Sequence, residues 1–183
     1  RDTTVYAKWI EKTDLGFTDV ADNSPFRAAI GWAVKEGITN GTSATTFSPG
    51  NTCTTAQILT FLWRANGSPN SNAACPASDV AETSPFYKAL CWANEKDLMT
   101  KGSGSTPCTR AAAVTYLWKL AGSPKMSVNS SFTDVPASAD FAQAVAWAVE
   151  QGVTNGVSAS EFAPDSTCTR GQIVTFLYRN LLD

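Results

Sequence analysis

The sequence predicts a mainly α-helical fold of three helix-loop-helix repeats. The first observation is a stretch that occurs three times, as "TCTTAQILTFLWR" at 52–64, "PCTRAAAVTYLWK" at 107–119 and "TCTRGQIVTFLYR" at 167–179. The second is that an amphipathic segment containing "WA" precedes each copy. The third is an apolar content of 43%, which is enough for a packed core. Recurrence of this kind is typical of repeat architectures and determines the fold class.

The repeats divide the chain into four parts. We expect repeat 1 at 17–69, repeat 2 at 70–124 and repeat 3 at 125–183, with 1–16 as a short β-like tail or linker. The connectors "GSPNSNAACP" and "GSPKMSVNSS" are rich in Gly, Pro and Ser, which is typical of loops. Asp19 to Thr55 and Asp134 to Arg170 are 36 positions apart, but Asp79 to Arg110 only 31. Repeat 2 therefore lacks part of the loop between its helices.

The first helix of repeat 1 is predicted to begin near Ser24-Pro25, since Pro is favoured in the first turn of a helix. Gly37 is a suitable C-terminal stop for this helix, as is Gly152 in repeat 3. The apolar residues of the first helix fall on one face. They are Phe26, Ile30, Ala33 and Val34.

The second helix of each repeat is predicted to start in the recurring stretch. Thr54 with Gln57, and Thr169 with Gln172, have the spacing of a capping box. This helix is apolar on most sides, which indicates a buried helix. Its apolar residues in repeat 1 are Ile58, Leu59, Phe61, Leu62, Trp63 and Ala65. One helix pair cannot cover such a helix, so we expect a pseudo-threefold arrangement of the repeats around a central three-helix bundle, with the first helices and the loops outside.

Composition narrows the classes of function. The net charge of −2 argues against a nucleic-acid surface, and no apolar run is long enough to span a membrane. Histidine is absent, which removes the commonest general base and the commonest metal ligand. We find no nucleophile–base pair and no repeated pair of carboxylates, so we expect no enzymatic activity, no cofactor and no metal. The chain starts at Arg1 without a signal peptide, and we expect it to be a fragment of a longer protein, acting as a monomer.

The five cysteines fall into two groups. Cys53, Cys108 and Cys168 share one position before the helix start, where a small buried apolar residue is expected and a metal site is the disfavoured alternative. Cys75 and Cys91 both lie in repeat 2, and a disulfide between them cannot be deduced from sequence.

The first position of the second helix holds Thr55, Arg110 or Arg170. A helix N-terminus presents free N–H groups and attracts anions, and the Arg fork suits a carboxylate or phosphate. One interpretation is therefore an anion-binding site. The other is a structural Arg that pairs with Asp79, Asp134 or another acid of a neighbouring repeat. Spacing alone leaves both open.

The ordered set "FTDV", "WAVxxG[IV]TNG", "FxP" and "[C]TRx[QE]" resembles the S-layer homology domain over Phe17 to Asp183. The resemblance implies three repeats around a central three-helix bundle and non-covalent anchoring of exported proteins to secondary cell-wall polymers. Such polymers typically carry pyruvate ketals, and the family's Thr-Arg-Ala-Glu motif supplies an Arg for the pyruvate carboxylate. The segment "TTVYAKW" is similar to the end of an internalin-type B repeat.

The motif departs from the family pattern, reading T-T-A-Q, T-R-A-A and T-R-G-Q in the three repeats. Repeat 1 lacks the Arg, and repeat 2 has a shortened loop. Repeat 3 keeps its Arg, loop and cap, and is expected to hold the main site. The polymer-binding residues that the resemblance implies are Arg170, Arg110, Thr169, Thr109, Asn155, Gly156, Gln172 and Trp147. For Trp147, as for Trp32 and Trp92, packing in the core competes with stacking on a sugar. For Asp19, Asp79 and Asp134, capping of a helix or stabilisation of a turn is favoured over contact with sugar hydroxyls.

The leading hypothesis is an extracellular cell-wall anchor of a bacterial surface protein, whose partner is an anionic, pyruvylated cell-wall polysaccharide. The alternative is a protein-interaction or adhesion module displayed at the cell surface, with other surface or host proteins as partners. Neither hypothesis involves nucleic acid or insertion into a membrane.

Overall fold

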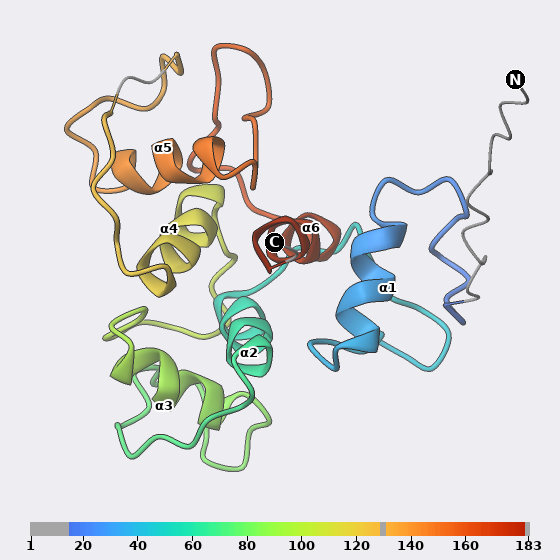
Figure 1. Cartoon of the computed structure of the whole chain (residues 1–183). Coiled ribbons are helices and arrows are strands. Elements are labelled where there is room, and N and C mark those ends of the chain that lie inside the picture. Colours follow the sequence, from blue (N-terminus) through green and yellow to red (C-terminus); the bar gives the residue numbers. More distant parts are fainter. Residues whose placement is uncertain (1–14, 129–130, 182–183) are drawn as a thin grey trace, which may run out of the picture.

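The computed structural model describes residues 15–128 and 131–181, and these contain six helices and no sheet (Figure 1). The predicted β-like tail lies almost entirely outside the described residues. The helices are α1 (Arg27–Lys35), α2 (Thr55–Ala65), α3 (Tyr87–Glu95), α4 (Arg110–Leu120), α5 (Ala142–Glu150) and α6 (Arg170–Leu181). Each repeat contributes two helices, as predicted, and the first is shorter than the second. None of the described helices is long and apolar enough to cross a membrane.

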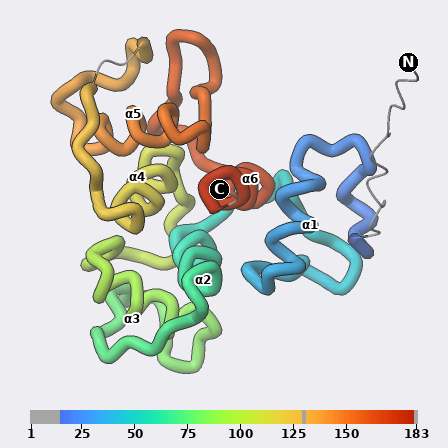
Figure 2. The backbone as a smooth tube through the Cα atoms, in the orientation of Figure 1, coloured from blue at the N-terminus to red at the C-terminus, as the bar shows by residue number. Residues whose placement is uncertain are grey.

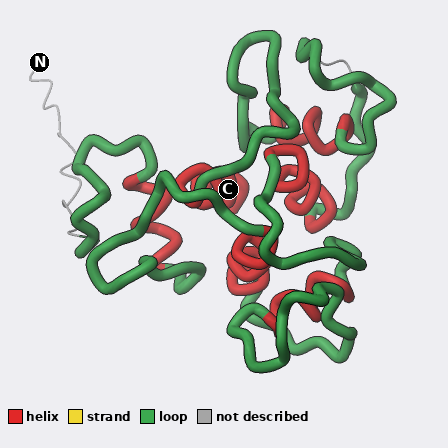
Figure 3. Tube along the Cα trace, turned by 180° about the vertical axis from the view of Figure 1, so that it is seen from behind, coloured by secondary structure: helices red, strands yellow, loops and turns green. Residues whose placement is uncertain are grey.

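The helices pack in pairs that cross the boundaries of the sequence repeats. The three packed pairs are α2 with α3, α4 with α5, and α6 with α1. Each pair is one lobe, and Figure 2 shows the three lobes arranged around a common centre. The second helix of each repeat therefore packs against the first helix of the next repeat, and the last repeat closes the ring onto the first. Long loops surround the helices of every lobe (Figure 3).

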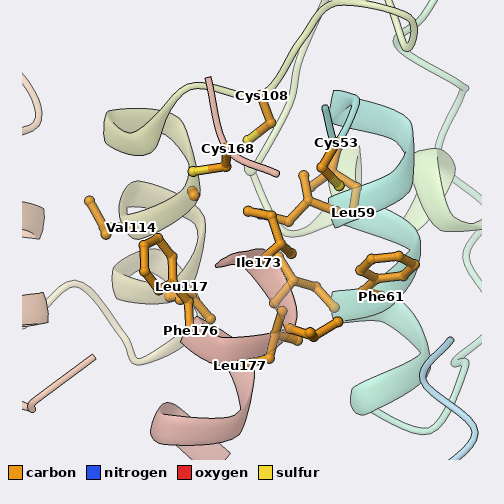
Figure 4. Packing of buried hydrophobic residues seen from close by; sticks show 14 of the residues in the cluster. Cys53, Leu59, Phe61, Cys108, Val114, Leu117, Cys168, Ile173, Phe176 and Leu177 are labelled. Carbon is orange, nitrogen blue, oxygen red and sulfur yellow. The ribbon is translucent and has the colours of Figure 1, made fainter. Parts of the chain in front are cut away.

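The second helices of all three repeats line the common core, as the apolar stripe predicts. Figure 4 shows side chains from α2, α4 and α6 that point toward one another at the centre. The largest fully buried residues of these helices are aliphatic. They are Ile58, Leu59, Leu62, Leu117, Ile173 and Leu177. Because no single lobe encloses this cluster, its burial depends on all three repeats.

A closed triangle of backbone hydrogen bonds joins the three second-helix starts. The N–H of Cys53 donates to the carbonyl of Cys168, Cys168 to Cys108, and Cys108 to Cys53, each at 2.8 Å. All three cysteine side chains are fully buried beside this triangle, as expected of small apolar residues (Figure 4). Burial raises the pKa of Cys53 to about 12 and that of Cys168 to about 11, so both stay thiols at neutral pH.

The short first helices begin and end close to the predicted residues. Helix α1 starts at Arg27, two positions after Pro25, and the Ser24 Oγ accepts a hydrogen bond from the N–H of Phe26. Gly37 follows the helix in the left-handed region, with φ of 68°, as its predicted role as a stop requires. In repeat 2 the same position holds Asp97, with φ of 54°.

The capping boxes predicted for the second helices are present. Thr54 Oγ1 accepts from the N–H of Gln57, and the Gln57 side chain accepts from the N–H of Thr54. Thr169 and Gln172 make the same two bonds. Thr109 accepts from the N–H of Ala112, whose side chain cannot return the second bond. The three N-caps thus start α2, α4 and α6 in the same way.

Candidate functional site at the junctions between repeats

Each second helix starts against a loop of the following repeat, and we call the three contact regions junctions. The N–H of Arg170 donates to the carbonyl of Asn51 and the N–H of Gly171 to that of Pro49. The first two N–H groups of α4 donate in the same way to the carbonyls of residues 166 and 164. The first two N–H groups of α2 donate to the carbonyls of residues 106 and 104. The prediction that the helix starts present free N–H groups to an anion is therefore wrong, because neighbouring loops already satisfy them.

Arg170 lies in the junction with the loop of repeat 1. Its Nε donates to the carbonyl of Phe47 at 3.0 Å and its Nη2 to the carbonyl of Asn40 at 3.2 Å. The guanidinium carbon lies 4.8 Å from the centre of the Phe47 ring and 5.6 Å from that of Phe61, within range of cation–π attraction. Only 5% of Arg170 is exposed. This Arg therefore helps to hold the loop of another repeat in place.

Arg110 makes the equivalent contacts with the loop of repeat 3. Its Nε donates to the carbonyl of Phe162 at 2.8 Å, and its Nη2 donates to the Thr154 hydroxyl at 3.3 Å. Its guanidinium carbon lies 4.8 Å from the centre of the Phe162 ring. Arg110 is also 5% exposed. The two Arg junctions are thus close copies of each other.

One nitrogen of each guanidinium remains available. Within the described part of the chain, Nη1 of Arg110 and Nη1 of Arg170 have no hydrogen-bond partner. No fully buried side-chain nitrogen or oxygen of the described residues lacks a partner, so these two atoms are not fully buried. Each Nη1 therefore reaches solvent. Ion pairs with carboxylates, the structural alternative considered from the sequence, are not formed by either Arg within the described residues. Carbonyl groups and aromatic rings take that role instead.

Asp19 and Asp134 hold the same loops from the other side. Asp19 accepts from the N–H groups of Phe47 and Ser48 at 2.8 and 2.7 Å, and Asp134 accepts from the equivalent groups of Phe162 and Ala163. Desolvation alone would raise the pKa of each Asp, but these hydrogen bonds outweigh it and the pKa falls below its ordinary value. Stabilisation of a turn, the role favoured from the sequence, is confirmed.

The junction of α2 is different because its loop is the shortened one of repeat 2. Thr55 occupies the position of the Arg and donates through Oγ1 to the carbonyl of Thr106 at 3.1 Å. A Cβ atom at Gly104 would lie 2.7 Å from Val80 Cγ2 and 3.1 Å from Ala56 Cβ, so the loop backbone packs closely here. Asp79 accepts bonds from the Ser103 and Ser105 hydroxyls and the N–H groups of Gly104 and Ser105. The missing Arg and the missing loop segment thus belong to one junction.

The structure divides the predicted site residues between two junctions. Asn155 and Gly156 belong to the loop that Arg110 contacts, so the expectation that they accompany Arg170 is wrong. The reason is that each second helix contacts the loop of the following repeat, and for α6 that loop is in repeat 1. Loop residues that the prediction missed include Asn40, Phe47, Thr154 and Phe162. One sequence signal could have identified them. Repeat 2 lacks the loop segment that contains Phe47 or Phe162 in the other repeats, and the loop of repeat 2 is the one that contacts Thr55 instead of an Arg.

The other predicted site residues have roles within the fold. Thr109, Thr169 and Gln172 make the capping bonds described above. Trp147 is 5% exposed, so it belongs to the core rather than to a surface that stacks on a sugar. Gly171, where the family motif has Ala, faces the ring of Phe26, the residue that precedes α1, and a Cβ there would lie 2.8 Å from ring carbons. The T-R-G-Q variant thus permits close packing of α1 against α6.

Two grooves lie toward the C-terminal ends of the central helices, and neither is lined by Arg110 or Arg170. Groove 1 has a volume of about 380 Å³, and its charged lining residues are Lys96, Lys119 and Glu95, beside Trp92 and Asn66. Groove 2 is smaller, about 260 Å³, and has Glu36 at the position of Lys96, with Arg64 at that of Lys119. Groove 1 is therefore the more basic of the two. Lys119 also forms an ion pair with Asp97 at 3.4 Å.

Comparison of the sequence with curated proteins gives no match. A family model does match two parts of the chain. The structure brings these two parts together, because Arg170 of one contacts Asn40 and Phe47 of the other. The model that matches residues 16–58 and 131–174 is that of the S-layer homology domain.

Proposed function

We propose that this chain anchors a bacterial surface protein to the cell wall by binding an anionic, pyruvylated secondary cell-wall polysaccharide. S-layer homology domains are cell-wall anchoring modules that bind secondary cell wall polymers, and they occur in cell-surface proteins. The observation that carries the proposal is the meeting of the two matched segments at Arg170. Repeat 2, with α3 and α4 in equivalent places, is proposed as a third domain of the same kind.

The carboxylate of the polymer is proposed to contact the solvent-facing Nη1 of Arg170, and in the second Arg junction that of Arg110. Nε and Nη2 of each guanidinium already donate to a loop, so Nη1 is the nitrogen proposed to make the charge-assisted contact with the carboxylate. Thr55 offers no cation, and its junction is not expected to bind an anion. Two of the three junctions are therefore proposed to bind the polymer.

Binding to purified cell-wall sacculi, before and after chemical removal of the secondary polymer, tests the function. We expect sedimentation with intact sacculi and its loss after the polymer is removed. Equal binding to both preparations would refute polymer anchoring. Capture by surface proteins without any binding to sacculi would favour the adhesion alternative instead.

Calorimetric titration with a pyruvylated disaccharide tests the assignment of the site. Arg170→Lys keeps the charge but removes the planar fork, and we expect roughly a tenfold loss of affinity. Thr55→Ala is the matched control and should bind as the wild type does, and melting curves should confirm that each variant is folded. If Arg170→Lys binds normally while Lys96→Ala loses binding, the polymer lies in groove 1 and the Arg residues serve the fold alone.

A further inference from the structure

The connector between repeats 1 and 2 is bound along α3. The indole N–H of Trp63 donates to the carbonyl of Pro69, which fixes the start of the connector. Ser71 Oγ then donates to the carbonyl of Cys91, and Asn94 Nδ2 donates to the carbonyl of Ala74 at 2.9 Å. Residues 69–74 are therefore held against two helices, and Cys75 follows directly.

The repeat in the fold indicates where the side chain of residue 75 points. Residues 15–36 of repeat 1 correspond to residues 75–96 of repeat 2 with a constant offset, which pairs Leu15 with Cys75 and Gly31 with Cys91. In repeat 1, a Cβ atom at Gly31 would lie 3.1 Å from Cδ2 of Leu15. The side chain of residue 15 therefore lies where a side chain of residue 31 would begin, and the same geometry is expected for residues 75 and 91. Repeat 2 has a cysteine at both positions.

The surroundings of the two cysteines agree with this geometry. Cys75 is partly exposed and packs against the core, whereas Cys91 is 5% exposed. Burial raises the pKa of Cys91, and the nearby Cys75 raises it further. Each thiol is therefore within electrostatic range of the other, and Cys75 is the more accessible of the two.

We propose that Cys75 and Cys91 form an intramolecular disulfide that fastens the connector to α3. This inference goes beyond polymer binding and does not depend on it. The oxidant is a disulfide of a small thiol. The Cys75 thiolate attacks one sulfur of the oxidant and releases one small thiol; Cys91, losing its proton, then attacks the mixed disulfide at Cys75 and releases the second. Two protein thiols are oxidised, and one small disulfide is reduced to two thiols.

The disulfide would close the loop from 75 to 91 and fix one wall of groove 1 to another, because Pro69 of the connector and Trp92 of α3 both line that groove. Cys53, Cys108 and Cys168 are fully buried beside the central triangle of backbone hydrogen bonds, and they should remain thiols in the folded protein. They provide an internal control for the selectivity of oxidation.

The experiment equilibrates the folded chain with oxidised glutathione, then alkylates it in denaturant without reductant and maps the peptides. We expect three alkylated cysteines, Cys53, Cys108 and Cys168, and one linked pair of peptides containing Cys75 and Cys91. Five alkylated cysteines, or a disulfide that involves Cys53, Cys108 or Cys168, would overturn the proposal.

Melting temperatures give a second readout. The oxidised wild type should melt roughly 5–10 °C above the same protein in reductant, the range for a loop of this length in a chain of this size. The matched control is Cys91→Ala, which places in repeat 2 the residue that repeat 3 has at this position, Ala146. Its melting temperature should not respond to reductant. An equal response in wild type and Cys91→Ala would also overturn the proposal.

Discussion

Two kinds of junction hold this molecule together, and they differ in one coordinated way. In the Arg junctions, a buried guanidinium stacks on a Phe ring and bonds to a loop of full length. In the third junction, Thr55 meets a loop that is five residues shorter, and the backbone near Gly104 packs into the interface. The backbone bonds at the helix start are the same in all three. The residue at the first position of each second helix therefore varies with the loop of the next repeat: Arg occurs where that loop has its full length, and Thr where it is shortened. It does not vary with the loop of its own repeat.

Arg110 and Arg170 contribute to the stability of the fold because they are buried in the junctions. A cation that faces solvent could be removed with little effect on stability, but these two are buried, and each donates to the carbonyl of a loop Phe. Ligand binding through Nη1 would then use a side chain that the fold already positions. Rigid presentation of this kind reduces the entropy lost on binding.

The largest effect is expected from Arg170→Ala and Arg110→Ala. Each leaves a buried carbonyl unpaired, opens a cavity and removes a cation–π contact, so we expect a loss of about 2–4 kcal/mol in the free energy of unfolding. Urea denaturation measures it. Thr55→Ala, which removes one neutral hydrogen bond, should cost about 1 kcal/mol. Equal losses in all three variants would mean that the junctions do not differ.

A smaller effect is expected from Gly104→Ala. The new methyl group would meet Val80 and Ala56, and overpacking of this kind costs about 1–3 kcal/mol. Gly50→Ala is the matched control in the loop of repeat 1, where a Cβ atom meets nothing within 4 Å. The control should unfold at the same urea concentration as the wild type. If Gly104→Ala does too, the shortened loop is not tightly packed.

The sequence predicts the helices better than the contacts between repeats. Caps such as Thr54 with Gln57 and stops such as Gly37 are local, so a few neighbouring residues are enough to identify them. The pairing of α1 with α6 is not local, because it depends on which way the ring of repeats closes. The same cause placed Arg170 beside the wrong loop in the prediction: Asn155 is near it in sequence, but Phe47 contacts it in space.

The caps should contribute equally in both types of junction. Thr169→Ala and Thr54→Ala each remove the oxygen that accepts from the third helical N–H, and each should cost about 1 kcal/mol. Thermal or urea unfolding of both variants measures this. A much larger cost for Thr169→Ala would mean that the Arg junction relies on its cap more than the Thr55 junction does.

Acid should weaken the loops through their aspartates. The pKa values of Asp19, Asp79 and Asp134 are lowered, so the stability they provide is present above the ordinary pKa of Asp, about 4. That stability is lost as the pH falls through the lowered values. Melting temperatures measured between pH 7 and pH 2 should decrease below about pH 4. Asp79→Asn should show a weaker dependence on pH, since the hydroxyls of Ser103 and Ser105 then face a neutral side chain.

The match between an Arg and the loop of the next repeat is tested most directly by two double-mutant cycles. The first combines Arg170→Ala with Phe47→Ala, and the second combines Arg170→Ala with Phe162→Ala, the equivalent Phe of its own repeat. We expect a coupling free energy of about 1 kcal/mol or more in the first cycle, and additivity within about 0.5 kcal/mol in the second. Coupling to Phe162 together with additivity at Phe47 would contradict the account, because Arg170 would then act on the loop of its own repeat.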